Sequence, residues 1–456
     1  MEIIKFFRGI NLNFRKSKLP APPIPSFPRS WKRISLLSKH GYITIMQSSS
    51  LCAVALFLLN TPLWADATAP LAAAQATKDQ AAVNVSAQAL IAELGEKAGQ
   101  PSEAPEFILP DEDAKSLEAA QVPSLFARAL ATLQMDAWWK TVPTGPDCPA
   151  PLRVVASAAE GCVLARQAGC EGAAALLEEA RAAADFLLLA QKTGGKAAFP
   201  FPAWRGKRGR YGMIADRLLK AAGDHEAAAI HDGWIVDDGH TGELNLDNAL
   251  AVSALLALYA ETKEERDLDA ARNAVSWMMQ RPLTILSHPN SFTVSALTKF
   301  YMITREVPVL SSALEICRLG ILPTQLTEGP NAGRWADPQD AKLVYHFQNL
   351  RAVAGLLLAL PTDSPDRPPL RKALRLGLAA YNETIITQGG SSLDAALDLY
   401  CLLMSHESEL GSTLKETHTP DAARMIFRAA VEEYRLEHPT ISPGTWGHFL
   451  LFTSGK

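Results

Sequence analysis

The chain is organised around residues 231–261, which read HDGWIVDDGHTGELNLDNALAVSALLALYAE. The first half of this stretch is a loop dense in Asp, His, Trp and Gly, and its second half is a helix with apolar residues nearly all round. Such a helix belongs inside a large protein or a membrane. Glu243, Asp247 and Asn248 at its start argue against a membrane span. We therefore interpret it as an interior helix whose N-terminal end presents acids and amides to a cleft.

Outward from this helix, the chain from residue 124 alternates helical periodicity with breakers and shows almost no period-two pattern. Helices that are apolar over most of their surface are predicted at 244–261, 291–305, 339–360 and 392–405. They alternate with amphipathic helices at 172–191, 265–280, 367–387 and 420–437, and further helices are predicted at 124–140, 152–168, 212–222, 308–320 and 444–453. Repeated hairpins of one buried and one half-exposed helix predict concentric rings, an all-α fold of the α/α-toroid type.

The connections also alternate in length, and this predicts where function sits. Links from an amphipathic to a buried helix are long, at about 192–243, 281–290 and 321–338. In a ring of hairpins these links share one face, and loops on a rigid scaffold are where binding and catalytic residues concentrate.

The segment Glu243-Leu-Asn-Leu-Asp247-Asn248-Ala-Leu-Ala-Val is similar to the acidic helix start of pectate lyases built on the α/α toroid. That helical-hairpin scaffold is shared by many carbohydrate-active enzymes, and as architecture the resemblance covers roughly residues 150–453. It implies acids that hold calcium and an Arg that acts as base. No cofactor is assigned with certainty, and the candidate is a divalent cation such as calcium.

The candidate catalytic residues lie on the long links or at the starts of the buried helices. General acid–base work on a glycosidic bond needs two opposed groups, commonly carboxyls, whereas a lyase needs a base and neutralisation of a uronate. Glu243 and Asp247 are one helical turn apart and share a face. The full candidate set is Asp238, Glu243, Asp247, His288, Arg334 and His346.

Candidate substrate-binding residues come from the same segments. Aromatic faces stack on sugar CH patches, amides bond hydroxyls, and a basic run in an acidic body suits a carboxylated or sulfated sugar through bidentate Arg contacts. The set is Trp204, Arg205, Arg208, Arg210, Trp234, Asn248, Asn290, Trp335, Tyr345, Asn349 and Trp446.

Each candidate has a structural alternative. Asp237-Asp238-Gly239 also fits a solvated turn, and Glu243 and Asp247 also fit helix capping. His346 also fits a core histidine with satisfied hydrogen bonds. At the level of function, the leading hypothesis is an enzyme that degrades a polysaccharide or oligosaccharide, as a lyase or a glycoside hydrolase. The alternatives are a non-catalytic sugar-binding or scaffold toroid and a helical repeat that binds a protein partner.

The N-terminal part of the chain has the pattern of a targeting segment. Residues 1–65 carry nine Lys or Arg and one acid, about +8, so the remainder is near −12 against a net charge of −4. An acidic body argues against nucleic-acid binding. The apolar run 51–59 and the Ala65–Asp66 junction predict a signal peptide cleaved after Ala65, and hence a periplasmic or secreted protein with no stable membrane span after cleavage. The alternative is an uncleaved membrane anchor. The partner expected from the polar and aromatic links is a carbohydrate substrate.

The predicted domains are a leader at 1–65, a flexible Ala- and Pro-rich segment at 66–123 with one helix at 86–97, and the toroid at 124–456. Five cysteines follow the leader: Cys148, Cys162, Cys170, Cys317 and Cys401. An oxidising compartment permits one or two bridges, and the odd count is equally consistent with buried, inert thiols. No P-loop, GxGxxG after a strand, HExxH or GxSxG is present.

Overall fold

The computed structural model describes residues 32–38, 41–47, 65–100, 139, 147–195, 197–204, 209–338, 341–388, 392–433 and 441–455. The chain forms two units, Met1–Leu63 and Trp64–Lys456. In the first unit, β1 (Lys32–Ser38) and β2 (Gly41–Gln47) pair antiparallel, from Lys32 opposite Gln47 to Ser38 opposite Gly41. The sequence pattern did not predict this hairpin, and the predicted helix at 124–140 lies outside the described residues.

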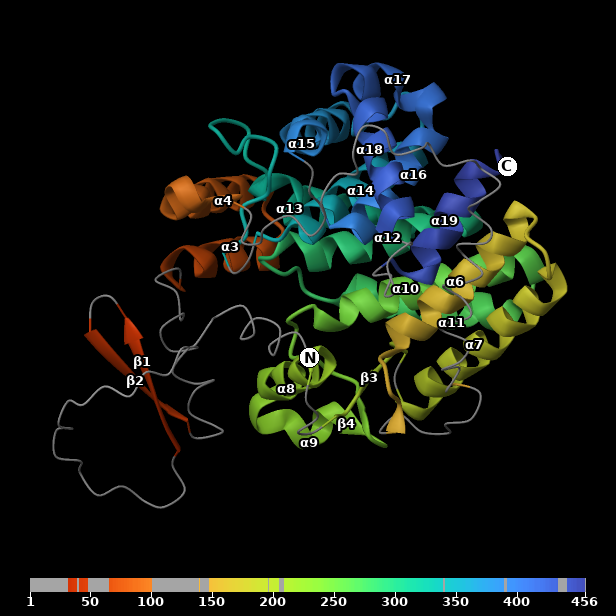
Figure 1. The fold of residues 1–456 in the computed structure, drawn as a ribbon, viewed down its shortest axis with the longest axis horizontal. Coiled ribbons are helices and arrows are strands. Elements are labelled where there is room, and N and C mark those ends of the chain that lie inside the picture. Colours follow the sequence, from red (N-terminus) through yellow and green to blue (C-terminus); the bar gives the residue numbers. More distant parts are fainter. Residues whose placement is uncertain are drawn as a thin grey trace. The chain divides into compact units, whose positions relative to one another are not determined.

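The second unit is built on a closed ring of inner helices (Figure 1). Each inner helix contacts the next along the chain, and the last contacts the first, which closes the ring. The inner helices are α6 (Leu152–Ala168), α10 (Glu243–Thr262), α12 (Ser287–Thr304), α14 (Leu343–Ala359), α16 (Leu393–Ser405) and α19 (Pro443–Thr453). The predicted α/α toroid is confirmed.

Each inner helix except α19 is followed by a helix of the outer ring that packs on it. α11 shows why such a helix lies outside: Leu268, Ala271, Val275 and Met278 form one buried stripe, and charged residues cover the rest. α10 is instead buried on most sides. The outer helices are α7 (Ala173–Thr193), α11 (Glu265–Gln280), α13 (Val307–Gly320), α15 (Arg367–Gln388), α17 (Glu407–Glu416) and α18 (Thr419–Glu433).

The first long link folds into a small substructure that the sequence pattern predicted only as a helix at 212–222. It contains β3 (Phe201–Pro202), α8 (Arg210–Ala222), η5 (Gly223–His225), α9 (Glu226–Ala229), β4 (Ile230–His231) and β5 (Trp234–Ile235). The three strands pair antiparallel in the order β3-β5-β4. Asn248 of α10 ties this link to the ring, because its side chain bonds both the N–H and the carbonyl of Phe199.

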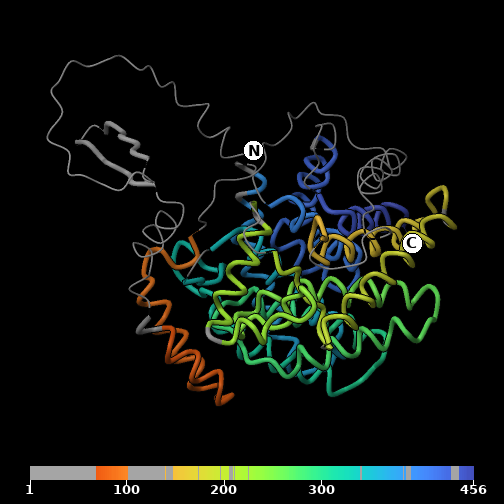
Figure 2. Tube along the Cα trace, turned by 90° about the horizontal axis from the view of Figure 1, so that it is seen from below, coloured from red at the N-terminus to blue at the C-terminus, as the bar shows by residue number. Residues whose placement is uncertain are grey.

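Residues 65–100 form two helices, α3 (Ala65–Thr77) and α4 (Gln80–Leu94), and a short turn, η1 (Gly95–Lys97) (Figure 2). Asp79 caps α4 by accepting from the N–H groups of Ala81 and Ala82. Apolar residues of these helices, including Leu71, Val83 and Leu90, form one cluster with Leu319, Leu326 and Ala336 of the ring. More of this segment is helical than the single helix predicted at 86–97, because its apolar positions have a partner surface beside α13 and η6 (Leu322–Thr324).

One stretch among the described residues, Val307–Thr324, is long and apolar enough by composition to cross a membrane, and 56% of it is buried within the fold. It corresponds to α13 and η6 of the outer ring. Core helices often pass this test of length and composition, so we interpret this stretch as a helix that packs on the inner ring.

Candidate functional site

The starts of the inner helices meet at one end of the ring. Arg153 of α6 bonds Asp247 of α10, and Asn245 of α10 donates to Thr293 of α12 at 3.1 Å. Asn349 of α14 donates to Ser287 of α12 at 2.8 Å. The long links therefore open at this end, which we call the entrance.

At the start of α10, the predicted acids are held by cations. Asp247 is fully buried and accepts two hydrogen bonds from the Arg153 guanidinium, at 3.0 and 2.5 Å. It accepts a third from the backbone N–H of Arg153 at 3.2 Å. Asp238 is also fully buried, pairs with Arg281 and accepts from the N–H of Leu244, which caps the helix. These bonds account for both acids structurally.

The remaining predicted acid is Glu243, which lies on the surface. It pairs with Arg217 at 2.9 Å, and both side chains are substantially exposed. The structure therefore does not join Asp238, Glu243 and Asp247 into one carboxylate cluster. Each has its own cation.

Among the predicted amides, two act as loop clamps. Asn290 bonds the backbone of Thr284, Leu286 and Gly320, and Asn248 clamps Phe199 as described above. Asn349 is buried between Ser287 and Ser291, whose hydroxyl donates to it at 2.5 Å.

The predicted tryptophans are core residues. Trp204, Trp234, Trp335 and Trp446 are each at most 4% exposed, and Trp335 donates its indole N–H to the carbonyl of Ile321 at 2.9 Å. Their ring faces are covered in this structure, so packing accounts for them. Of the predicted basic run, Arg205 and Arg208 lie outside the described residues, and Arg210 is described only as the first residue of α8.

Two predicted residues from different helices come together at the entrance. The His288 ring of α12 stacks on the Tyr345 ring of α14, with centroids 3.6 Å apart and planes within 4°. Nδ1 of His288 lies 3.5 Å from Oδ2 of Asp337, at the end of the third link. We call His288, Tyr345 and Asp337 the entrance cluster. Asp337 was not among the predicted catalytic residues.

Beside the entrance cluster lies a small cavity of about 10 Å³, whose lining includes Arg334, Lys342, Tyr345 and His346. Such a volume holds about one water molecule. The Arg334 guanidinium lies 4.7 Å from the Tyr381 ring centre. Burial holds the pKa of His346 well below its usual range and raises the pKa of Tyr381 to about 12, so both are neutral at pH 7.

A second polar group lies at the middle of the ring and was missed by the sequence reasoning. Lys299 of α12 contacts Glu160 of α6 at 2.9 Å, and Arg351 of α14 contacts Asp398 of α16 at 2.6 Å. His448 of α19 lies 3.3 Å from Glu160 and 3.8 Å from Asp398. Each of these charged residues interrupts an otherwise apolar inner helix, and that signal is visible in the sequence.

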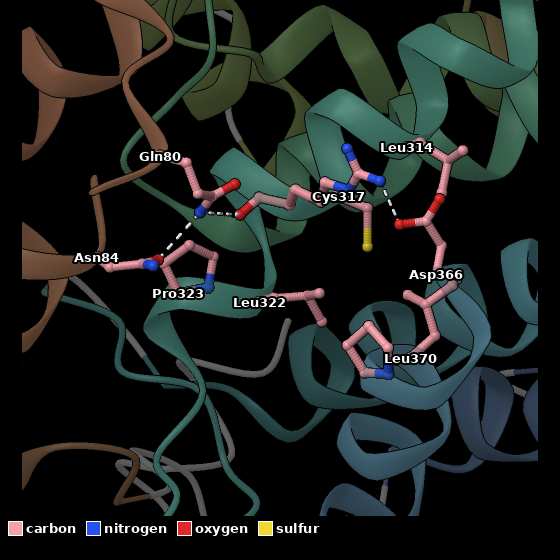
Figure 3. Close-up of a pocket in the computed structure, with 10 residues that line it drawn as sticks. Gln80, Asn84, Leu314, Cys317, Leu322, Pro323, Asp366 and Leu370 are labelled. Carbon is pink, nitrogen blue, oxygen red and sulfur yellow. Dashed lines mark hydrogen bonds and ion pairs between the residues drawn. The ribbon is translucent and has the colours of Figure 1, made fainter. Parts of the chain in front are cut away.

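A cavity of about 250 Å³ lies away from the entrance, between α4, α13 and α15. Figure 3 shows Gln80 and Asn84 on one side of it and Asp366 and Leu370 on the other. Arg318 and Asp366 form an ion pair on its rim, and Leu314, Leu322 and Leu370 make its lining largely apolar. The acid and the base on this rim, Asp366 and Arg318, are paired with each other.

Among the described residues, no group of three or more His, Cys, Asp or Glu side chains is placed to hold a metal ion. Cys317 and Cys401 are free, buried thiols. Burial raises the pKa of the Cys317 thiol to about 12, which keeps it protonated and unreactive.

No protein-family model matches this chain, and neither does any curated protein sequence. Several solved structures resemble it, and two of them are described here. A polysaccharide lyase has a TM-score of 0.46 at 12% identity over 74% of this chain and 96% of its own. A glycosyl hydrolase of family 88 from Bacteroides vulgatus has a TM-score of 0.46 at 11% identity over 74% of this chain and 99% of its own.

Proposed function

We propose that this chain is a carbohydrate-active enzyme, a lyase that cleaves an acidic polysaccharide at the entrance cluster. The observation that carries the proposal is the stack of His288 on Tyr345, two proton-transfer groups brought from two helices to one partly exposed point. Both side chains can give or take a proton, and the stack brings both to the same point, where one substrate can reach them.

Asp337 determines which ring nitrogen of His288 carries the proton. A carboxylate beside Nδ1 favours the tautomer with its proton on that nitrogen, which leaves Nε2 as the basic atom. The side chain of Asp337 is 5% exposed against 14% for His288, and Asp337 also contributes to the lining of the small cavity. Its role is to orient His288 and to stabilise the charged imidazolium.

The nearby cations fit a uronate substrate. Arg334 and Lys342 line the cavity next to Tyr345, where they would neutralise a sugar carboxylate and so acidify the adjacent C–H. His288 removes this proton. The C–O bond to the leaving sugar then breaks as a C=C bond forms, and the Tyr345 hydroxyl donates a proton to the leaving oxygen. The proton on His288 returns to Tyr345, and no water is consumed.

The cluster favours elimination over hydrolysis. A glycoside hydrolase of the usual kind places two carboxyl groups on opposite sides of the scissile bond. The entrance cluster has one carboxyl, that of Asp337. Asp238 and Asp247 are each already bound to an arginine.

The test is a panel of acidic and neutral polysaccharides, followed by both the ultraviolet absorbance of unsaturated uronate and the release of reducing ends. We expect both signals from an acidic polymer. Reducing ends without absorbance would indicate a hydrolase, and binding without either would indicate a non-catalytic carbohydrate-binding toroid.

The basic leader and the apolar run 51–59 support a further part of this proposal, export to the periplasm or the medium with cleavage after Ala65. N-terminal sequencing of the protein from its native host tests this. A mature chain beginning at Asp66 is expected, and a soluble form that keeps residues 46–65 would contradict it.

A further inference from the structure

The space enclosed by the six inner helices, here the lumen, contains a continuous polar network to which every inner helix contributes one residue. Glu160 accepts a bond from Ser253 of α10 at 2.6 Å and contacts Lys299 and His448. Asp398 links His448 to Arg351. We call these six residues the lumen network: Glu160, Ser253, Lys299, Arg351, Asp398 and His448.

The network faces open space. The side chains of Lys299 and His448 are 31% and 25% exposed, although both lie on helices that line the inside of the ring. Gly355 lies one turn after Arg351 on α14 and so shares its face. A Cβ atom built at Gly355 would meet only Thr298, at 4.0 Å. Solvent therefore reaches the middle of the lumen, and room remains beside Arg351.

The charges of the network balance. Two carboxylates, Glu160 and Asp398, stand beside two cations, Lys299 and Arg351, and the pKa of Glu160 lies well below its usual range because Lys299 and His448 offset its burial. An anionic ligand would face the carboxylates, and a cationic one would face Lys299 and Arg351. A neutral hydroxyl group can donate to a carboxylate and accept from a cation at the same time.

We propose that the lumen network is a binding site for a neutral, hydroxyl-rich sugar unit. Rings of hydroxyls match alternating donors and acceptors, and a charge-assisted hydrogen bond is stronger than a neutral one. The network would also serve to hold the ring together, but a purely structural network needs neither the exposure of Lys299 nor the space at Gly355.

A line of side chains joins this site to the entrance cluster. His288, Phe292, Ser295 and Lys299 follow one face of α12 at helical spacing, and Phe292, Ser295 and Lys299 are partly exposed. The ring of Phe292 lies 6.4 Å from that of His288, edge to face. Its partly exposed surface is a stacking surface between the two sites. Resting on the proposed function, the lumen occupant is a neutral sugar of the same polysaccharide whose uronate is cleaved at His288.

The test fills the lumen without touching a charge. Gly355→Phe places a ring in the open space beside Arg351, and Gly355→Ala is its matched control. Both replace a helical glycine with a residue of better helix propensity. The probes are glucose, galactose, mannose and N-acetylglucosamine, each added alone and followed by saturation-transfer NMR.

We expect wild type and Gly355→Ala to bind at least one of these sugars, and Gly355→Phe to lose that binding. Lys299→Gln removes one charge-assisted bond and should weaken binding about tenfold or more. If Gly355→Phe unfolds, Gly355→Leu and Lys299→Gln carry the test. Binding of no probe, or equal binding by a folded Gly355→Phe or Gly355→Leu protein, would overturn the proposal.

The two proposals fail separately. His288→Ala should abolish cleavage and leave monosaccharide binding intact. If no polysaccharide is cleaved but Gly355→Phe still blocks sugar binding, the lyase proposal fails and the lumen site stands. If cleavage is found with a KM that Gly355→Phe does not change, the lumen site fails and the lyase stands.

Discussion

The start of α10 and the starts of α12 and α14 lie at the same end of the ring, yet their polar residues are held very differently. At α10, Asp247 is fully buried and receives three bonds from Arg153. At α12 and α14, His288 and Tyr345 are partly exposed, and the carboxylate of Asp337 lies 3.5 Å from the imidazole. An acid whose lone pairs are already occupied serves the fold, whereas a stacked and accessible pair can exchange protons with a substrate.

The largest effect should come from breaking the ion pair of Arg153 and Asp247. Arg153→Ala leaves the carboxylate of Asp247 buried without its cation, and such a change costs about 3–5 kcal/mol of unfolding free energy. Urea denaturation at pH 7 measures it. Asp247→Asn should also destabilise the protein. If Asp247→Asn leaves stability unchanged but removes activity, Asp247 belongs to the reaction and the contrast between the two regions is wrong.

The second effect should come from the stacked pair of His288 and Tyr345, where we expect a change in activity and not in stability. His288→Ala should lower kcat/KM on the cleaved polysaccharide by about a hundredfold or more, the usual contribution of a general base. Its melting temperature should change little, because the ring is partly exposed. His418→Ala, at a surface histidine with a 75% exposed side chain, is the matched control. Equal loss of activity in both variants would contradict the role of His288.

A buried acid of the outer ring extends the comparison to the dependence of stability on pH. Asp267 of α11 is fully buried without a hydrogen-bond partner, and burial raises its pKa to about 6. Because the folded pKa exceeds the unfolded value near 3.8, the folded state binds this proton more tightly. Its contribution to stability is therefore greatest below pH 4 and is lost as the pH rises through 6.

Asp267→Asn should accordingly stabilise the protein by about 3 kcal/mol at pH 7 and above, with most of the gain lost near pH 4. Urea titrations of both proteins between pH 4 and 8 measure this difference. Asp269→Asn, whose side chain is 66% exposed, is the control. A gain independent of pH would show that Asp267 is ionised in the folded state throughout.

The sequence predicted the ring because burial periodicity is local. The bounds predicted for 152–168 and 265–280 agree with α6 and α11. The sequence could not show which polar residues serve the fold and which could serve a reaction. An Asp at a helix start has the same sequence pattern whether or not an arginine such as Arg153 binds it. Glu160 and Asp398 were not identified from the sequence because each lies in the middle of an inner helix, far in sequence from its partner, and only closure of the ring brings them to His448.

The smallest effect should come from Glu243, the predicted acid one turn before Asp247. Its pair with Arg217 lies at the surface, where such a bond contributes about 0–1 kcal/mol. Glu243→Gln also removes a charge from the first turn of α10, where the helix dipole favours acids. We expect a loss of about 0.5 kcal/mol in urea denaturation and unchanged kcat/KM. Arg217→Gln should give a similar small loss, because it removes the same pair from the other side. A Glu243→Gln protein that is as stable as wild type but inactive would return the reaction to the start of α10, and would make the entrance cluster a binding element instead.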